Sequence, residues 1–302
     1  MTAKTGFPYG EAFSRNLGWV TVAEQERLRR SRVAVAGLGG VGGFHVTTLA
    51  RLGIGAFSLA DFDRFDYPNF NRQAGAMVST IGRPKAEVIA EMARDINPEA
   101  DLRIFPNGIS PQNIDEFLEG AAVYIDGLDF FALEARERVF ARCREKGIPA
   151  VTAAPVGMGS AVLVFTPDGM SFEDYFGFAG CSDDEKALRF LVGLTPARLH
   201  SSYLVEPDRI DVANRKAPST PMGCMLAAGT AAAEVLKLIL GRGPVHAAPW
   251  GYHFDAFRNR MRRTWRPGGY RNPLQRLAIA IGKKRFGIKP AGDRGGFRHA
   301  DA

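Results

Sequence analysis

Cysteine is scarce in this sequence of 302 residues, which has three cysteines, Cys143, Cys181 and Cys224. Three dispersed cysteines exclude a disulfide-rich scaffold. No Cys-x-x-Cys pair occurs and the five histidines show no ligand spacing, so a structural zinc site is not expected. The chain has no uninterrupted run of about 18 apolar residues and no apolar signal core in its first 16 residues. We therefore expect a cytoplasmic protein without an integral membrane segment.

Acidic residues are scarce at the carboxyl end. Residues 258–302 hold 13 Lys and Arg against two Asp, whereas the rest of the chain holds 26 basic and 30 acidic residues. The sequence therefore predicts a mildly acidic domain over residues 1–265 and a basic tail over residues 266–302. A basic tail of this kind could bind RNA, an anionic membrane surface or an acidic protein partner. The alternative is a solvated tail that binds none of these. Residues 274–286 of the tail are apolar and basic, and we expect them to pack on the domain rather than lie on a membrane surface.

What the sequence does contain is the pattern of a nucleotide-binding βαβ unit. An apolar run at 33–36 predicts a buried strand, followed by the glycine turn 37–43, a helix at 45–52 and a second strand at 56–60. Glycines let the backbone approach phosphate oxygens, and the helix N-terminus offers free N–H groups with partial positive charge. Asp61 ends the second strand, where a carboxylate can accept hydrogen bonds from ribose hydroxyls.

Strands and helices continue to alternate after this unit. Further strands are predicted at residues 102–105, 121–126, 149–154, 159–167 and 250–255, and helices at 22–28, 85–96, 115–118, 131–146, 183–191 and 226–240. This alternation predicts an α/β fold with a doubly wound, mostly parallel, Rossmann-like sheet. The last two strands are expected to be antiparallel additions near the carboxyl end.

Polar side chains follow the predicted strands at the edge where such folds bind ligands. Asn69 and Arg72 lie on the loop after the second strand, Lys85 begins the next helix, and Asp129 follows the fourth strand. Two cations and one acid suit nucleotidyl transfer, because cations stabilise charge on the α-phosphate and pyrophosphate while a carboxylate holds Mg²⁺. Hydride transfer has no phosphate leaving group and needs no such cluster.

Taken together, these motifs resemble the ThiF/MoeB group of adenylyltransferases, which are related to ubiquitin-activating enzymes. The resemblance covers residues 10–168 and resumes at 229–241. It rests on the glycine turn, Asp61-Phe62-Asp63, Asn69-x-Asn71-Arg72-Gln73, Gly82-x-Pro84-Lys85, Ile96-Asn97-Pro98 and Asp126-Gly127-Leu128-Asp129, in this order.

The resemblance implies ATP and Mg²⁺ as cofactors and a role for each matching position. Asn69, Arg72 and Lys85 would bind the phosphates and stabilise the transition state, and Asp129 would hold Mg²⁺. Arg15 corresponds to an arginine that enters the neighbouring subunit's site, which implies a homodimer. The remaining nucleotide-binding positions are Gly37, Gly39, Gly40, Gly42, Asp61, Gln73 and Asp63, the last of which could instead cap the following loop.

In the family reaction an acceptor carboxylate attacks the α-phosphate of ATP and pyrophosphate departs. The acceptor could be the C-terminus of a ubiquitin-like protein or peptide, or a modified tRNA base as in the tRNA threonylcarbamoyladenosine dehydratases of the same family. Members that form a thioester or persulfide use a cysteine before the last helix, where this chain has Asn214-Arg215-Lys216.

A structural role is expected for Cys224, and Cys181 has a weaker claim to reactivity. His45 is expected to be a packed side chain, and Asp126 a structural acid at a strand end. Two other functions stay open from the residues alone. The chain could be an NAD-binding oxidoreductase, which only the glycine turn supports, or a non-catalytic nucleotide-binding scaffold.

Overall fold

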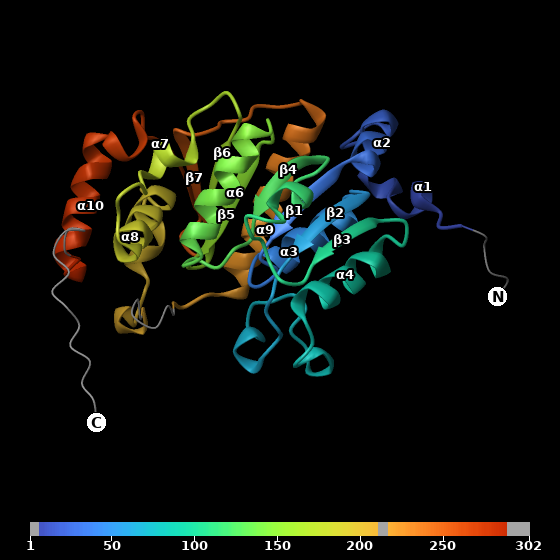
Figure 1. Ribbon diagram of the computed structural model, residues 1–302, viewed down its shortest axis with the longest axis horizontal. Helices are drawn as coiled ribbons and strands as arrows, with labels where there is room; N and C mark the ends of the chain where they lie inside the picture. The colour runs from blue at the N-terminus through green and yellow to red at the C-terminus, as the bar shows by residue number, and fades with distance from the viewer. Residues whose placement is uncertain (1–5, 211–216, 289–302) are drawn as a thin grey trace.

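Eight strands form one sheet in the order β3-β2-β1-β4-β5-β6-β7-β8. The computed structural model (Figure 1) describes residues 6–210 and 217–288. The strands are β1 (Arg32–Ala36), β2 (Ala56–Ala60), β3 (Asp101–Phe105), β4 (Ala121–Asp126), β5 (Ala150–Val156), β6 (Gly159–Phe165), β7 (Trp250–Asp255) and β8 (Arg260–Trp265). Strands β1 to β5 pair in parallel and β6 to β8 pair antiparallel. The predicted doubly wound sheet with antiparallel C-terminal strands is confirmed.

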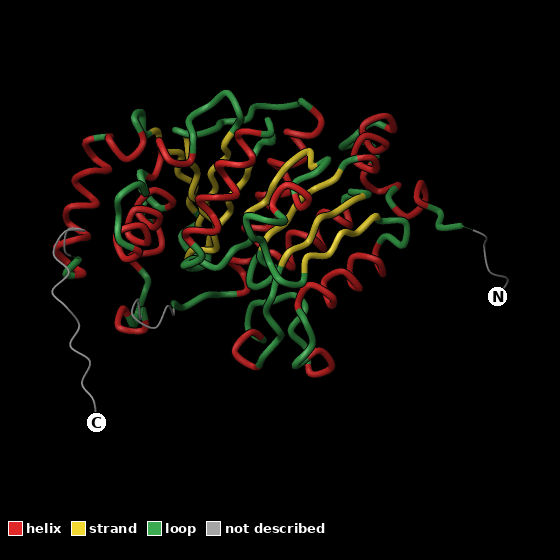
Figure 2. The backbone as a smooth tube through the Cα atoms, viewed as in Figure 1, coloured by secondary structure: helices red, strands yellow, loops and turns green. Residues whose placement is uncertain are grey.

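Helices cover both faces of this sheet (Figure 2). They are α1 (Tyr9–Ala12), α2 (Val22–Arg30), α3 (Gly42–Arg51), α4 (Lys85–Ile96), α5 (Ile114–Phe117), α6 (Leu133–Glu145), α7 (Phe172–Phe176), α8 (Asp183–Leu194), α9 (Pro221–Leu240) and α10 (Pro273–Phe286). The described residues also form short 3₁₀ turns, which are η1 (Ser14–Asn16), η2 (Tyr67–Asn69), η3 (Val78–Thr80), η4 (Leu199–Ser202), η5 (Pro207–Arg209) and η6 (Gly269–Arg271).

Alternating side chains of the strands divide the core into two layers. In β1, Val33 and Val35 pack with α3, α4 and α9, whereas Ala34 and Ala36 pack with the aromatic layer beneath α5 to α8. Both faces of a central parallel strand are covered, so its residues form a continuous apolar run rather than an alternating one. This burial explains why β1 is readable from sequence as a short apolar segment.

Strand β8, the first turn of α9 and the short helices α1 and α7 are regular segments that the sequence did not predict. Strand β8 is rich in arginine and mostly exposed, and it pairs with β7 at the edge of the sheet. An edge strand need not carry the apolar pattern on which strand prediction depends. Helix α9 begins five residues earlier than predicted, because Thr220 accepts a hydrogen bond from the Gly223 N–H and Pro221 occupies the first turn.

Helix α9 is long and apolar enough to cross a membrane by length and composition, although half of that segment is buried inside the structure. The sequence criterion of an uninterrupted apolar run missed it, because Thr230, Glu234 and Lys237 interrupt the run. Its apolar residues pack against α3, β5 and β6. We therefore place α9 in the core of the fold.

Part of the predicted basic tail is a regular element of the structure. Helix α10 packs on α8, with Gln275, Ile279 and Gly282 buried between them. One face of the 274–286 stretch packs on the domain, as expected. Residues 289–302 lie outside the described part of the chain, and the boundary at residue 266 between domain and tail stays a prediction.

His45 on α3 is fully buried, as expected of a packed side chain, and neither ring nitrogen has a hydrogen-bond partner within the described part of the chain. Burial lowers the pKa of His45 to about 3, and likewise lowers the pKa of His253 on β7 to about 4. A histidine that stays neutral when folded stabilises the fold above its unfolded pKa, and this stability is lost as the pH falls toward the folded pKa.

We expect the free energy of unfolding to fall as the pH drops below about 6.5, because the unfolded chain then binds protons that the folded chain excludes. Each such histidine contributes a slope of roughly 1.4 kcal/mol per pH unit. His45→Leu should flatten the dependence by about that amount in urea denaturation between about pH 7 and pH 5. An unchanged slope in this variant would show that His45 is protonated in the folded state.

Candidate functional site

The glycine turn after β1 lies against the turn after β4 at the carboxyl edge of the sheet. Gly37 has a positive φ of 80°, and its N–H donates to the Ala60 carbonyl at 2.8 Å. A β-carbon on Gly37 would overlap the carbonyl of Gly127, and one on Gly42 would overlap the carbonyl of Gly37. Only glycine permits this backbone contact. It places the start of α3 at the sheet edge, where none of the side chains in residues 6–210 and 217–288 caps the first N–H groups.

Gly39 and Gly40 face side chains rather than backbone. A β-carbon on Gly39 would lie 3.4 Å from the Gln73 amide nitrogen, and one on Gly40 would lie 3.8 Å from Arg72 Nε and 3.5 Å from Cys224 Sγ. The Gln73 side chain is 8% exposed, and its Oε1 has no partner among the described residues. A buried acceptor without a partner is costly, so Gln73 is suited to receive a donor from a ligand.

Asp61 links the glycine turn to the loop after β2. Its two carboxylate oxygens accept hydrogen bonds from the Leu38 N–H at 2.6 Å and the Asp63 N–H at 2.8 Å. Burial raises the pKa of Asp61, while these two hydrogen bonds and the charge of Lys85 oppose the rise. Each oxygen keeps a second lone pair that can accept from a ribose hydroxyl.

Lys85, the first residue of α4, is a buried cation beside this acid. Its side chain is 7% exposed, and Nζ donates to Asp63 Oδ2 at 2.9 Å. The backbone repeats the link, because the Lys85 N–H donates to the Asp63 carbonyl at 2.9 Å. Asp63 therefore positions Lys85, an arrangement that sequence reasoning missed. An ammonium group has three donors, so Lys85 can bind a phosphate while keeping this partner.

The loop after β2 carries Arg72 and Asn69 and projects beyond the sheet (Figures 1 and 2). Arg72 Nη1 donates to the Pro68 carbonyl at 2.8 Å and to Asn71 Oδ1 at 2.9 Å. The Asn69 side chain accepts from the Asp66 N–H at 3.0 Å, so its oxygen caps η2. Asn71 Nδ2 donates to the Ser219 carbonyl at 2.9 Å, which ties the loop to the segment before α9.

The two acids after β4 have different surroundings. Asp126 forms a buried ion pair with Arg136 at 2.7 Å, and both side chains are at most 2% exposed. This pairing gives Asp126 the expected structural role. Asp129 is exposed and uses one oxygen to accept from the Phe131 N–H at 3.0 Å. Its other oxygen can bind Mg²⁺, which proteins usually hold by one or two carboxylates together with substrate phosphates.

Metal binding at this edge would need such a substrate. Within residues 6–210 and 217–288, no group of three or more His, Cys, Asp or Glu side chains could hold a metal ion. The donor set therefore fits Mg²⁺ that is shared with a nucleotide, and does not form a cage of its own.

Arg15 is the predicted site residue that the fold does not bring to the glycine turn. It is exposed on η1, and the neighbouring Asn16 side chain donates to the carbonyl of Leu52 at the end of α3. Helix α3 starts at the glycine turn, at the carboxyl ends of the parallel strands, and ends near their amino ends. Arg15 therefore lies near the amino ends of the strands, away from the glycine turn.

None of the three cysteines is an exposed nucleophile beside the glycine turn. Cys224 is fully buried, and burial raises the pKa of its thiol, against the opposing effects of Ser219 and Arg72. Burial also raises the pKa of Cys181 and of Cys143. The Asn214-Arg215-Lys216 position lies outside the described residues.

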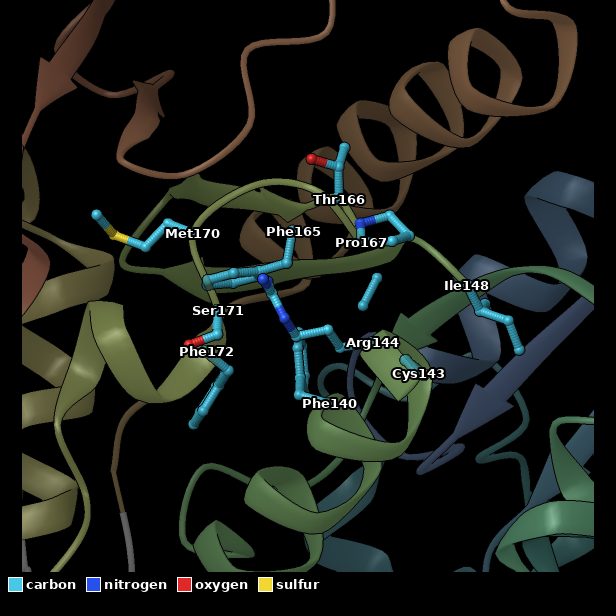
Figure 3. A pocket seen from close by; sticks show the side chains of 11 residues that line it. Phe140, Cys143, Arg144, Ile148, Phe165, Thr166, Pro167, Met170, Ser171 and Phe172 are labelled. Atoms are coloured by element: carbon cyan, nitrogen blue, oxygen red, sulfur yellow. The ribbon is translucent and has the colours of Figure 1, made fainter. Parts of the chain in front are cut away.

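A small enclosed pocket lies elsewhere and does not compete as a nucleotide site. Figure 3 shows it between Phe140 and Arg144 of α6 and Phe165 at the end of β6, with Thr166 and Phe172 nearby. The end of β6 pairs with the start of β5, because the two strands are antiparallel. The pocket therefore lies at the amino ends of the parallel strands, whereas the glycine turn lies at their carboxyl ends. The pocket volume of about 10 Å³ has room for roughly one water molecule.

A doubly wound sheet with a close-packed glycine turn, an uncapped helix start and an acid after the second strand defines a nucleotide-binding α/β protein. Comparison with known families then agrees with the sequence resemblance. The chain belongs to the ThiF family, whose model matches residues 13–276.

Individual relatives match slightly less than half of the chain. It is 39% identical over 132 residues to the tRNA threonylcarbamoyladenosine dehydratase of Haemophilus influenzae, covering 43% of this chain and 50% of that protein. It is 32% identical over 143 residues to the sulfur carrier protein ThiS adenylyltransferase of Escherichia coli, covering 47% and 56%. The chain thus spans about half the length of the curated relatives it matches.

Solved structures share the fold over more of the chain. The crystal structure of the Escherichia coli tRNA N6-threonylcarbamoyladenosine dehydratase TcdA has a TM-score of 0.56 at 23% identity, covering 77% of this chain and 95% of that one. That of Escherichia coli MccB with ATP has a TM-score of 0.64 at 20% identity, covering 84% and 71%. At these identities the likeness concerns the fold alone.

The backbone contact at the glycine turn predicts a difference between two glycines of similar φ. Gly37→Ala must displace the Gly127 carbonyl, whereas Gly147, with a φ of 70°, has open space around it. In urea denaturation we expect Gly147→Ala to cost about 1 kcal/mol and Gly37→Ala about 3 kcal/mol or more. Equal destabilisation by the two substitutions would mean that the turns after β1 and β4 can move apart without loss of folding stability.

Proposed function

We propose that this protein is an adenylyltransferase that uses ATP and Mg²⁺ to activate a carboxylate as an acyl-adenylate. The proposal rests on the position of two cations around the glycine turn. Asp63 holds the buried Lys85 beside Asp61. The Arg72 guanidinium lies next to Gly40. Two cations around a glycine turn suit a nucleotide whose phosphates gain negative charge during the reaction.

Each residue then has a role that follows from its position. The free N–H groups of α3, together with Arg72 and Lys85, bind the phosphates, and Asp61 accepts hydrogen bonds from the ribose. Asp129 is the residue that would hold Mg²⁺, which neutralises phosphate charge. The acceptor carboxylate oxygen forms a bond to the α-phosphorus, and the bond from that phosphorus to the pyrophosphate oxygen breaks.

The acceptor is proposed by chemical class. Relatives are named for a sulfur carrier protein and for a modified tRNA base, so a ubiquitin-like protein or peptide C-terminus and a tRNA are the candidates. Transfer without a thioester is favoured, because Cys224 is buried and its neutral thiol is a poor nucleophile. We place the reaction in the cytoplasm.

The two alternative functions account for fewer of these residues. An NAD-binding oxidoreductase would use the glycine turn and Asp61, but hydride transfer has no use for Lys85 and Arg72 beside the phosphates. A non-catalytic scaffold could hold a nucleotide with the glycine turn alone, and would not need two cations that stabilise the charge gained in a transition state. Tight binding of NAD without binding of ATP in calorimetry would favour the first alternative.

A homodimer would complete the site with Arg15 from the second copy. Arg15 lies at the edge opposite its own glycine turn, close in sequence to the exposed apolar residues Leu17, Trp19 and Val22. Apolar side chains that are gathered at a surface often mark an interface between subunits. This segment is therefore the surface that we propose for the dimer contact.

Exchange of pyrophosphate into ATP, measured with candidate acceptors present, tests the proposed site. Arg72→Ala, Lys85→Ala and Asp129→Ala should each lower exchange by roughly 100-fold or more, because each removes a group that stabilises the transition state, worth about 2.7–4 kcal/mol. Arg94→Ala on the exposed face of α4 is the control and should leave exchange unchanged. Undiminished exchange in the first three variants would exclude these residues from the site.

Mixing two inactive variants tests the role of Arg15. Arg15→Ala and Lys85→Ala should each be nearly inactive alone, because each breaks every site of its own dimer. After subunit exchange, mixed dimers contain one intact site, so activity should return to about a quarter of the wild-type value. If activity does not return although gel filtration shows mixed dimers, Arg15 does not act across the interface.

A further inference from the structure

Helix α10 is held firmly on the domain by one of its faces. Gln275, Ile279 and Gly282 are buried where α10 packs on α8 and η6, and a β-carbon on Gly282 would collide with the Leu188 side chain of α8. Lys283 forms an ion pair with Glu185 of α8 at 2.6 Å. Figure 1 shows α10 at one end of the molecule, beside α8 and far from α1 and α2. These contacts fix the orientation of the helix, so the same residues of α10 always face the solvent.

The outer face carries an apolar stripe. Leu274, Leu277 and Ile281 follow the i, i+3, i+7 spacing of one helix face, and they are 62%, 59% and 58% exposed. An amphipathic helix normally turns such a stripe toward the core, but here the core-facing positions are occupied by other residues. We name Leu274, Leu277 and Ile281 the outer stripe.

Charge around the outer stripe has one sign. Arg276, Lys284 and Arg285 are exposed on α10, and residues 273–286 contain no Asp or Glu. Glu185, the acid that α10 meets on α8, is occupied by Lys283 and Arg189. Whatever covers the outer stripe must therefore supply apolar contact and negative charge together.

Other occupants fit this combination poorly. A second copy docked stripe to stripe would bring the same cations together without acids between them, which is unfavourable. Residues 289–302 contain Lys289, Arg294 and Arg298 and few large apolar residues, so their composition does not match. Binding of single-stranded RNA without sequence preference relies on aromatic stacking, which the three aliphatic side chains of the outer stripe cannot provide.

We propose that α10 lies on the surface of an anionic lipid bilayer. Leu274, Leu277 and Ile281 enter the boundary between headgroups and acyl chains, while Arg276, Lys284 and Arg285 meet the lipid phosphates. The protein is thereby held at a membrane surface by a helix that does not span it. This binding is separate from the nucleotide site at the glycine turn.

Sedimentation of the full chain with lipid vesicles tests the proposal. We expect binding to phosphatidylcholine vesicles that contain phosphatidylglycerol, little binding to pure phosphatidylcholine, and weaker binding as salt increases. The double variant Leu277→Gln/Ile281→Gln should bind at least about tenfold more weakly. Lys284→Gln/Arg285→Gln should also lose about tenfold or more.

The matched control is Val205→Gln/Met261→Gln, which makes the same kind of change at exposed positions away from α10 and from the proposed dimer contact, and it should bind like the wild type. Thermal unfolding followed by circular dichroism shows that each variant is folded, and pyrophosphate exchange should be unchanged in all of them. Loss of vesicle binding is thus distinct from loss of the proposed enzymatic activity.

Four results would overturn the proposal. The first is no binding to vesicles with phosphatidylglycerol. The second is equal binding by the Leu277→Gln/Ile281→Gln variant, which would assign binding to basic charge alone. The third is a change of oligomeric state in that variant, which would make the outer stripe an interface between copies. The fourth is stripe-dependent binding of tRNA in place of vesicles.

Discussion

The backbone contact between the turns after β1 and β4 is the constraint on which the site depends. Gly37, Gly42 and Gly127 approach so closely that a β-carbon on any of them would overlap a facing backbone atom. The contact sets the direction of α3 and leaves the N–H groups of its first turn uncapped. Asp61 is placed relative to the same turn by its hydrogen bond to the Leu38 N–H. The nucleotide-binding geometry is thus built into the backbone before any charged side chain contributes.

Charge at the carboxyl edge is arranged as two ion pairs with different purposes. Asp126 and Arg136 are both buried, and removing one partner of such a pair usually costs about 3–5 kcal/mol, so this pair stabilises the loop after β4. In the pair of Lys85 with Asp63, the lysine is buried but the acid is half exposed. The second pair therefore keeps a cation positioned and still accessible to a phosphate. The fold separates a stabilising pair from one that can bind a ligand.

Helix α9 connects the site to the antiparallel part of the sheet. Its apolar body packs on β5 and β6, while its first turn lies at the site with Cys224 next to Gly40. Thr220 caps the helix and also donates to the Gly157 carbonyl in the turn between β5 and β6 at 2.7 Å. The same composition that makes α9 resemble a membrane-spanning segment lets it fill the core. Contact with lipid is proposed instead for α10, whose apolar residues face outward.

The sequence alone determined the features that depend on local spacing: the glycine turn, Asp61 after the second strand, and the alternation that predicts a parallel sheet. These are readable because backbone conformation and strand burial restrict residue type within a few positions. Only the tertiary structure decided that Asp63 holds Lys85, that Cys224 is buried beside Gly40, and that Arg15 lies at the far edge. It also paired the arginine-rich β8 with β7 and turned the outer stripe of α10 outward. Such outcomes depend on which distant segments meet, and no local pattern of residues records that.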